Sequence, residues 1–274
     1  MEAGKLYDAH YFRHGCGRPY QRDAEWLQFF DRIAERIIQT IAPRTVLDVG
    51  CAMGFLVEAL RRRGVEAYGL DISEYAISQV HPDIRPYCWV GSATEPLPQR
   101  YDLIVCLEVL EHLPPAETEQ AVANLCHHTD DLLFSSTPLD YQEPTHFNVQ
   151  PPEYWTELFA RYGFIRDVAY DTTWLTPWAR RFRRTREPLS RLVAAYEARL
   201  WRLEAENWAL RSALLQNREA MARLEGENQA LQTEVVQLRA QMQALRRSLT
   251  WRATEPIRRV WAVVRRPGQG RGTG

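Results

Sequence analysis

The chain has 274 residues, enough for one or two domains, and its apolar content of 45% is typical of a protein with a buried core. Its formal net charge of −1 excludes a strong overall field that would attract nucleic acid or a membrane. No apolar run reaches the ~20 residues of a membrane span, and the N-terminus lacks the apolar segment of a secretory signal. The five cysteines show no CxxC spacing. We therefore expect reduced thiols in a cytoplasmic protein.

The first 42 residues predict a flap followed by a helix. Residues 1–20 are rich in Tyr, His and Gly and have no regular apolar period, so we interpret them as an irregular flap over a pocket. His10, His14 and Cys16 would supply only three ligands to a metal, which makes a metal site the weaker interpretation. In residues 21–41 the apolar side chains recur at spacings of three and four, which predicts a helix.

Residues 43–178 alternate between strand and helix patterns. The expected strands are 45–49, 66–70, 84–90, 101–107, 131–136 and 164–170, and the expected helices are 54–63, 73–80, 114–127 and 151–162. A seventh strand is a weaker prediction at 172–178, because Pro177 lies inside it. The alternation predicts an α/β domain with a doubly wound, mostly parallel sheet that is covered on both faces.

The composition changes after Trp178. Residues 179–195 are rich in Arg and are interpreted as a linker, and residues 196–250 carry an unbroken heptad repeat. Leu occupies most d positions and Asn occupies two a positions, Asn207 and Asn228, a pattern that favours a parallel homodimeric coiled coil. The alternative is a long helix that folds back on the globular domain.

The tail, residues 251–274, combines Trp and aliphatic residues with many Arg. This composition suits an interfacial helix on an anionic membrane, which would make the protein membrane-associated. The alternatives are a site for a partner protein, such as a glycan-assembly protein, and a solvated basic end.

A glycine-rich turn follows the first predicted strand. Glycine lets the backbone approach a ligand closely, and the next helix begins with unpaired N–H groups. The pattern acid-x-Gly-x-Ala-x-Gly resembles motif I of class I S-adenosylmethionine (SAM)-dependent methyltransferases, and the resemblance covers about residues 40–175. It implies a Rossmann-like methyltransferase domain that binds SAM through Asp48, Gly50, Cys51, Ala52 and Gly54. Ala52 departs from the family pattern, which has glycine there.

The ends of the next strands extend this resemblance. Asp71 ends the second strand, where the family has an acid that accepts hydrogen bonds from both ribose hydroxyls. The alternative role for Asp71 is that of an acid at a helix N-terminus beside Ser73. The resemblance also implies that SAM contacts Ile72, Ser92, Ala93, Leu107 and Glu108.

The run from Glu108 to His112 is similar to that of a large branch of small-molecule O-methyltransferases. Glu108, Glu111 and His112 share one face of a helical turn. Together with His146, they resemble the metal site of ubiquinone-pathway O-methyltransferases and of enzymes that methylate the 2′-hydroxyl at small-RNA ends. The resemblance thus implies a Mg²⁺ site formed by these four residues. Without a metal, His112 or His146 would act as a general base, with Glu111 as a further catalytic candidate.

Together these patterns predict a SAM-dependent O-methyltransferase. We expect its acceptor to be a sugar or another small hydroxylated compound, because the coiled coil and the Trp/Arg tail resemble parts of bacterial surface-polysaccharide proteins. One alternative is an RNA 2′-O-methyltransferase, although the core shows no basic groove with interleaved aromatics, so we do not expect nucleic acid as a partner. The other is a non-catalytic SAM-binding scaffold.

Overall fold

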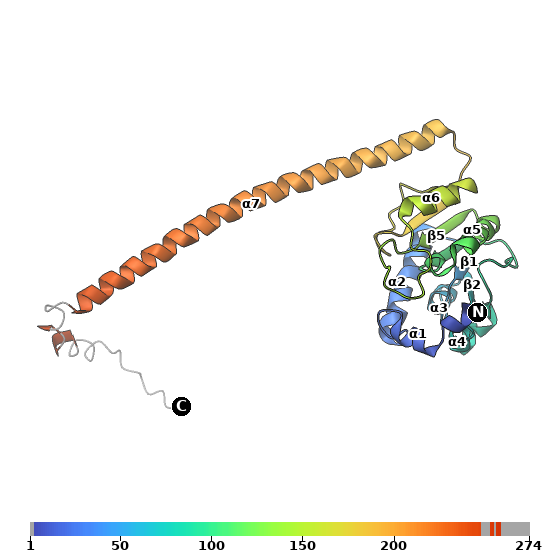
Figure 1. The fold of residues 1–274 in the computed structure, drawn as a ribbon, viewed down its shortest axis with the longest axis horizontal. Coiled ribbons are helices and arrows are strands. Elements are labelled where there is room, and N and C mark those ends of the chain that lie inside the picture. Colours follow the sequence, from blue (N-terminus) through green and yellow to red (C-terminus); the bar gives the residue numbers. More distant parts are fainter. Residues whose placement is uncertain (1–2, 248–252, 255, 259–274) are drawn as a thin grey trace, which may run out of the picture. The chain divides into compact units, whose positions relative to one another are not determined.

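The computed structural model describes residues 3–247, 253–254 and 256–258 (Figure 1). The chain divides into two compact units, Met1–Arg199 and Leu200–Gly274. The first unit holds every strand of the described chain. No helix among the described residues is both long enough and apolar enough to cross a membrane.

The N-terminal segment is more regular than the sequence predicts. It contains a short 3-10 helix, Ala3–Leu6, and an α-helix, α1 (Ala9–His14). Helix α1 begins at Asp8, whose carboxylate accepts hydrogen bonds from the backbone N–H groups of His10 and Tyr11. The prediction of an irregular segment is therefore wrong here. The predicted helix that follows is confirmed as α2 (Ala24–Thr40).

A seven-stranded sheet with the order β3-β2-β1-β4-β5-β7-β6 forms the centre of the first unit. The five strands from β3 to β5 are parallel, and β7 is antiparallel to both of its neighbours. This mixed sheet confirms the α/β prediction. The strands are β1 (Thr45–Val49), β2 (Glu66–Asp71), β3 (Cys88–Val90), β4 (Leu103–Leu107), β5 (Asp131–Ser135), β6 (Phe164–Arg166) and β7 (Arg180–Arg184).

Helices cover both faces of the sheet. Alternate residues of a strand point to opposite faces, so Val46 and Leu47 of β1 belong to different core clusters. The cluster of Leu47 includes residues of α5 and α6, and the cluster of Val46 includes residues of α2, α3 and α4. The additional helices are α3 (Phe55–Arg61), α4 (Glu74–Ser78), α5 (Pro115–His128) and α6 (Pro152–Arg161).

Two predicted strands are less than half as long in the structure. The third was expected at 84–90, but Pro82–Tyr87 is a 3-10 helix and only Cys88–Val90 is a strand. Pro82 and Pro86 lack the N–H groups that a sheet requires, which explains this difference. The sixth strand, expected at 164–170, ends at Arg166.

The last strand lies where the sequence predicted a linker. No strand forms at 172–178, and β7 instead lies at Arg180–Arg184, between β5 and β6. Only Phe182 of this strand is fully buried. The arginines of β7 form ion pairs with acids on other segments: Arg181 with Asp131 and Asp167, and Arg184 with Asp130. The predicted domain end at residue 178 and the predicted linker at 179–195 are therefore both wrong.

Helix α7 (Leu189–Arg247) is continuous and includes most of the predicted heptads. No described side chain of α7 is buried. The second copy that the heptad repeat predicts remains a prediction. Most of the predicted basic tail, residues 251–274, lies outside the residues that the structure describes.

Candidate active site

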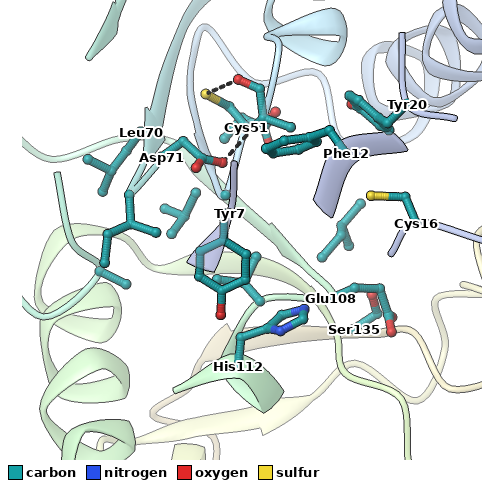
Figure 2. Close-up of a pocket in the computed structure, with 18 of the residues that line it drawn as sticks. Tyr7, Phe12, Cys16, Tyr20, Cys51, Leu70, Asp71, Glu108, His112 and Ser135 are labelled. Atoms are coloured by element: carbon teal, nitrogen blue, oxygen red, sulfur yellow. Dashed lines mark hydrogen bonds between the residues drawn. The ribbon is translucent and has the colours of Figure 1, made fainter. Parts of the chain in front are cut away.

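A cavity of about 460 Å³ lies in the first unit, beside the carboxyl ends of β1, β2 and β4 (Figure 2). This edge of a parallel sheet is where open α/β folds bind ligands. Most of the predicted site residues line the cavity: Asp48, Gly50, Cys51, Ala52, Asp71, Ile72, Ser92, Ala93, Leu107, Glu108, His112 and His146. Gly54 and Glu111 do not line it.

One side of the cavity, here called the strand-end wall, is formed by Asp48, Gly50, Ala52, Asp71 and Ile72. Gly50 has a φ of 76°, and a Cβ atom there would lie 2.3 Å from Cγ2 of Val109. Ala52 also has a positive φ, 46°, in the left-handed region that disfavours side chains. This conformation accompanies a hydrogen bond from Ala52 N to Oδ2 of Asp71, at 2.7 Å. The turn after β1 is therefore bonded directly to the end of β2.

Two acidic side chains lie close together in this wall. Asp71 accepts a second hydrogen bond, from Ser73 N at 2.8 Å, and burial nevertheless raises the pKa of its carboxyl. The Asp48 carboxylate accepts no hydrogen bond from any residue that the structure describes. Burial and then the charge of Asp71 raise the pKa of Asp48 well above its ordinary value. These acids form no ion pair with a described basic residue. A ligand with ammonium or hydroxyl donors would satisfy them.

Gly54, the last glycine of the motif, has a structural role. It has a φ of 73° at the start of α3, and a Cβ atom there would lie 2.8 Å from Cδ1 of Ile84. Gly54 therefore allows α3 to pack closely but does not contact the cavity. Its predicted contact with SAM remains a prediction.

The opposite side, here called the histidine wall, is formed by Tyr7, Tyr11, Glu108, His112 and His146. Nδ1 of His112 lies 3.0 Å from the carbonyl oxygen of Thr145, and Nδ1 of His146 lies 2.9 Å from that of Asp140. A carbonyl oxygen can only accept, so each Nδ1 carries a hydrogen, and the neutral form of either ring has its lone pair on Nε2.

The two imidazoles are neighbours, with ring centroids 4.6 Å apart. Burial, and next the adjacent His146, lower the pKa of His112 to about 4. His112 is therefore neutral at physiological pH, with an Nε2 that can accept a proton or a hydrogen bond. This geometry is compatible with the base role predicted for His112 and His146.

Glu108 has an unusual backbone conformation directly after β4. Its φ is 53°, its N–H donates to the carbonyl oxygen of Ser135 at 3.0 Å, and its Oε1 accepts from the indole N–H of Trp178 at 2.8 Å. Strained residues of this kind are concentrated at functional sites. No sequence signal identified Trp178, because it lies seventy residues after Glu108 in the chain.

Glu111 lies behind the histidine wall and is fully buried. Its Oε1 accepts from Thr137 N at 3.3 Å, and its carbonyl oxygen accepts from Asn148 N at 2.9 Å. Burial and then the charge of Glu108 raise the pKa of the Glu111 carboxyl well above its ordinary value. Glu111 therefore links loops that carry the wall, and its predicted catalytic role is not supported by its position.

The predicted metal ligands do not form a metal site. Glu108 accepts a hydrogen bond from Trp178, and Glu111 does not line the cavity. Across residues 3–247, 253–254 and 256–258, no group of three or more His, Cys, Asp or Glu side chains is arranged to hold a metal ion. The residues therefore do not fit the Mg²⁺ that the sequence pattern implied.

The N-terminal segment forms the rest of the cavity lining. Figure 2 shows Tyr7 beside His112, and the two rings meet edge to face with centroids 5.5 Å apart. Tyr11 approaches the same imidazole at 6.2 Å. Burial raises the pKa of both tyrosines and raises that of Cys16 to about 11, so all three groups are neutral at pH 7. The sequence predicted a flap here but did not identify these side chains.

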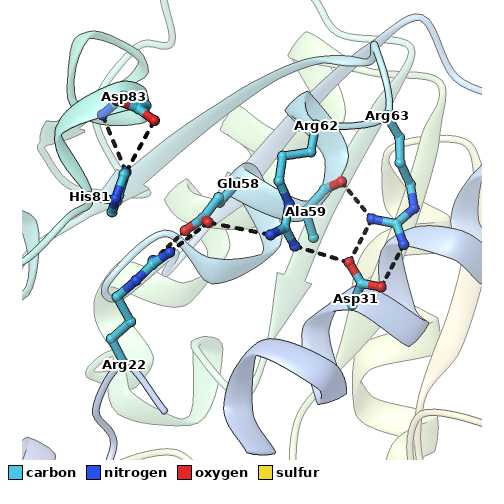
Figure 3. A network of polar contacts seen from close by, with 8 residues as sticks. All are labelled: Arg22, Asp31, Glu58, Ala59, Arg62, Arg63, His81 and Asp83. Atoms are coloured by element: carbon cyan, nitrogen blue, oxygen red, sulfur yellow. Dashed lines mark hydrogen bonds and ion pairs between the residues drawn. The ribbon is translucent and has the colours of Figure 1, made fainter. Parts of the chain in front are cut away.

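A polar network holds this segment to the domain (Figure 3). Arg22, two residues after the cavity residue Tyr20, donates two hydrogen bonds to the largely buried carboxylate of Glu58 in α3. Directly after α3, Arg62 and Arg63 pair with Asp31 of α2. The Arg22–Glu58 pair thus anchors the end of the segment that lines the cavity.

Residues 19–166, more than half of the chain, match the sequence model of the methyltransferase-domain family. The chain therefore belongs to this family of methyltransferases, and the matched residues include the strand-end wall and most of the histidine wall.

The chain also matches individual curated proteins, but only over part of its length. The chain is 35% identical over 112 residues to the ubiquinone biosynthesis O-methyltransferase of Nitrosomonas europaea, covering 37% of this chain and 47% of that protein. It is 38% identical over 97 residues to the enzyme of the same name from Pseudomonas paraeruginosa. This match covers 32% of this chain and 40% of that protein. The chain thus spans about half the length, or less, of these curated relatives.

A solved structure supports the fold. The magnesium protoporphyrin IX methyltransferase of Synechocystis PCC 6803, crystallised with SAM, superposes with a TM-score of 0.51 at 19% identity. The match covers 68% of this chain and 98% of that one. At this identity the similarity shows the fold alone.

Proposed function

We propose that the protein is a SAM-dependent methyltransferase that methylates a hydroxyl group of a small acceptor. The observation that carries this proposal is the pair of Asp48 and Asp71 in the strand-end wall, opposite the neutral His112 and its neighbour His146. This arrangement provides one side for a cationic cofactor and another for a hydroxyl group. The resemblance of the sequence to O-methyltransferases favours oxygen as the methylated atom.

The strand-end wall suits the polar groups of SAM. The ammonium group would satisfy Asp48, which has no hydrogen-bond donor among the described residues, and the ribose hydroxyls would donate to Asp71. Each oxygen of Asp71 keeps a second lone pair beside its hydrogen bond from Ala52 or Ser73. The adenine would lie against Ile72, Ser92 and Ala93.

The histidine wall would position the acceptor and receive its proton. SAM would supply the methyl group: the hydroxyl oxygen would attack the methyl carbon, the C–S bond of the sulfonium would break as the C–O bond forms, and S-adenosylhomocysteine would leave. The attacking oxygen gains positive charge, so its proton becomes acidic and passes to Nε2 of His112 or His146. A base with a pKa of about 4 is sufficient for this late transfer. Most of the acceleration would come from holding the oxygen in line with the methyl group.

The volume of the cavity also limits the size of the acceptor. A volume of about 460 Å³ is at the lower end of the range for small-molecule sites, and SAM would fill a large part of it. Tyr7, Tyr11 and Leu113 add apolar surface around the histidines. We therefore propose a small ring-containing alcohol or phenol, and a sugar intermediate of glycan synthesis is the first candidate to test.

The test is calorimetric binding of SAM, followed by transfer of labelled methyl to separate panels of sugars, phenols and RNA 3′ ends. We expect SAM binding and label in a sugar or phenol, with the same rate after treatment with EDTA. Label only in RNA would favour the RNA alternative. Binding without transfer to any fraction of a cell extract would favour a scaffold, and no binding would contradict the proposal.

A further inference from the structure

Helix α7 carries an exposed apolar stripe over most of its length. From Leu200 to Leu245, a and d positions alternate without interruption, and none of these side chains is buried within the chain. The a positions are Leu200, Asn207, Leu214, Met221, Asn228, Val235 and Met242, and the d positions are Leu203, Leu210, Asn217, Leu224, Leu231, Leu238 and Leu245. A stripe with a 3.5-residue period winds slowly around a helix and matches another helix that supercoils with it. A lone helix with so much exposed apolar surface would be only marginally stable in water.

We propose that this stripe binds the same stripe of a second copy of the chain, so that residues 200–247 form a parallel, in-register, two-stranded coiled coil. The inference does not depend on the catalytic proposal, because it uses only residues outside the first unit.

The charged positions beside the stripe support this pairing. In a parallel dimer, each g residue faces the e residue five positions later on the partner. Glu206 would then face Arg211 of the partner subunit, and Glu234 would face Arg239 of the partner subunit. The other g–e pairs in this stretch each include an uncharged residue, so no like charges meet.

The asparagines determine direction and register. In a parallel in-register dimer, Asn207, Asn217 and Asn228 would each meet the same residue of the partner, so their amides could bond to one another. An antiparallel pairing of the full stretch would place Asn228 opposite Asn217 but Asn207 opposite Leu238. One amide in each chain would then be buried without a partner, which costs stability. This difference favours the parallel arrangement.

The first test is the mass of the full chain by light scattering over a range of concentrations. A dimer is expected, and a monomer or a trimer would overturn the proposal. The second test compares two double variants that add equal charge. Leu224→Lys with Leu231→Lys changes two d positions, whereas Leu215→Lys with Val236→Lys changes two b positions on the outer side.

These positions are well matched, because Leu215 and Leu224 are the same residue type and are each 60% exposed in the single chain. We expect the d-position variant to be monomeric and the b-position variant to remain dimeric. Equal behaviour of the two variants would overturn the assignment of this face. Circular dichroism and SAM binding would verify that the first unit is still folded in both variants.

The relative direction of the two helices is tested by measuring the distance between spin labels attached to a cysteine introduced by Gln237→Cys in each chain. The native protein, labelled in the same way, provides the background signal. In a parallel dimer the two labels would lie within about 25 Å of each other. In the antiparallel pairing they would lie about 44 Å apart, since Gln237 would be level with Trp208 of the other chain, twenty-nine residues away at about 1.5 Å each. The longer distance would overturn the parallel assignment.

Discussion

The strand-end wall and the histidine wall face the same cavity but depend on different parts of the chain. The strand-end wall consists of the ends of two adjacent parallel strands and the tight turn between β1 and α3. The histidine wall combines the N-terminal segment, the end of β4 and the loop after β5. The first wall is fixed mainly by the backbone, and the second depends on side chains that hold loops in place.

This difference separates cofactor binding from acceptor binding. A site made of strand ends is rigid and suits a cofactor that all members of a family share. A site made of loop side chains can change without disturbing the sheet, and so it suits an acceptor that differs between members. Changes in the two walls should therefore affect different measured quantities.

The largest effect is expected from Asp71→Ala, in the strand-end wall. The variant removes both proposed ribose hydrogen bonds and frees the N–H groups of Ala52 and Ser73, so SAM affinity should fall by about 100-fold or more. Calorimetry would measure it, with the exposed Asp83→Ala as the control. An affinity within threefold of the native value would refute the assignment of the cofactor to this wall.

His112→Gln, in the histidine wall, should lower the rate of methyl transfer and leave cofactor binding intact. We expect kcat to fall by about 100-fold, the lower range for loss of a general base, while the Kd for SAM stays within threefold. The exposed His127→Gln should leave both values unchanged. A parallel loss of SAM affinity would show that the two walls are not separable.

The pH profile sharpens this test. The pKa of His112 is about 4, so its neutral form persists as the pH falls from 8 to 5 and is lost only near pH 4. The part of the rate that His112 provides should therefore show no inflection near 6.5, the ordinary histidine value. An inflection near 6.5 that disappears in His112→Gln would contradict this expectation.

Glu58→Gln tests how the histidine wall is held. Arg22 lowers the pKa of Glu58 by hydrogen bonding, so the pair stabilises the fold above the ordinary carboxyl pKa and loses this effect as the pH falls through the lowered value. Loss of the pair should cost about 2 kcal/mol of unfolding free energy and raise hydrogen exchange in residues 3–20.

Asp31→Asn is the matched control, because it breaks the neighbouring, more exposed Asp31–Arg63 pair, which does not involve the cavity segment. It should leave exchange in residues 3–20 unchanged. If both variants loosen that segment equally, the anchoring role of Arg22 is wrong.

The smallest effect is expected from Ala52→Gly. Relief of the positive φ is partly offset by the greater freedom of glycine in the unfolded chain, so the net gain should be about 0.5 kcal/mol. Ala42→Gly provides a control, since Ala42 has a φ of 55° but does not line the cavity. Both variants should raise the melting temperature, and only Ala52→Gly should change SAM affinity.

The contrast between the walls also explains what the sequence could predict. Asp48, Gly50 and Asp71 follow apolar strand patterns directly, so local periodicity and turn chemistry locate them. Tyr7 lines the cavity and Trp178 bonds to Glu108 only through tertiary packing, and nothing in their neighbouring residues indicates a ligand site. Glu111 belongs to the same short motif as His112, but it is fully buried and does not line the cavity.

Strand β7 was missed for a related reason. Its five residues are four arginines and Phe182, which no pattern of alternating apolar residues would identify as a strand inside a sheet. The charges are accommodated because Asp130, Asp131 and Asp167 lie beside them in the folded domain. Such compensation between distant residues is not visible in a local window.

The position of β7 has a consequence for synthesis on the ribosome. β6 joins the sheet only through β7, so β5 keeps an open edge until residue 184 has been made and released from the exit tunnel. An unpaired edge can bind other nascent chains, so this interval is the most vulnerable period for aggregation. Because the heptads are translated after β7, each domain can complete its sheet before its helix meets that of a second chain.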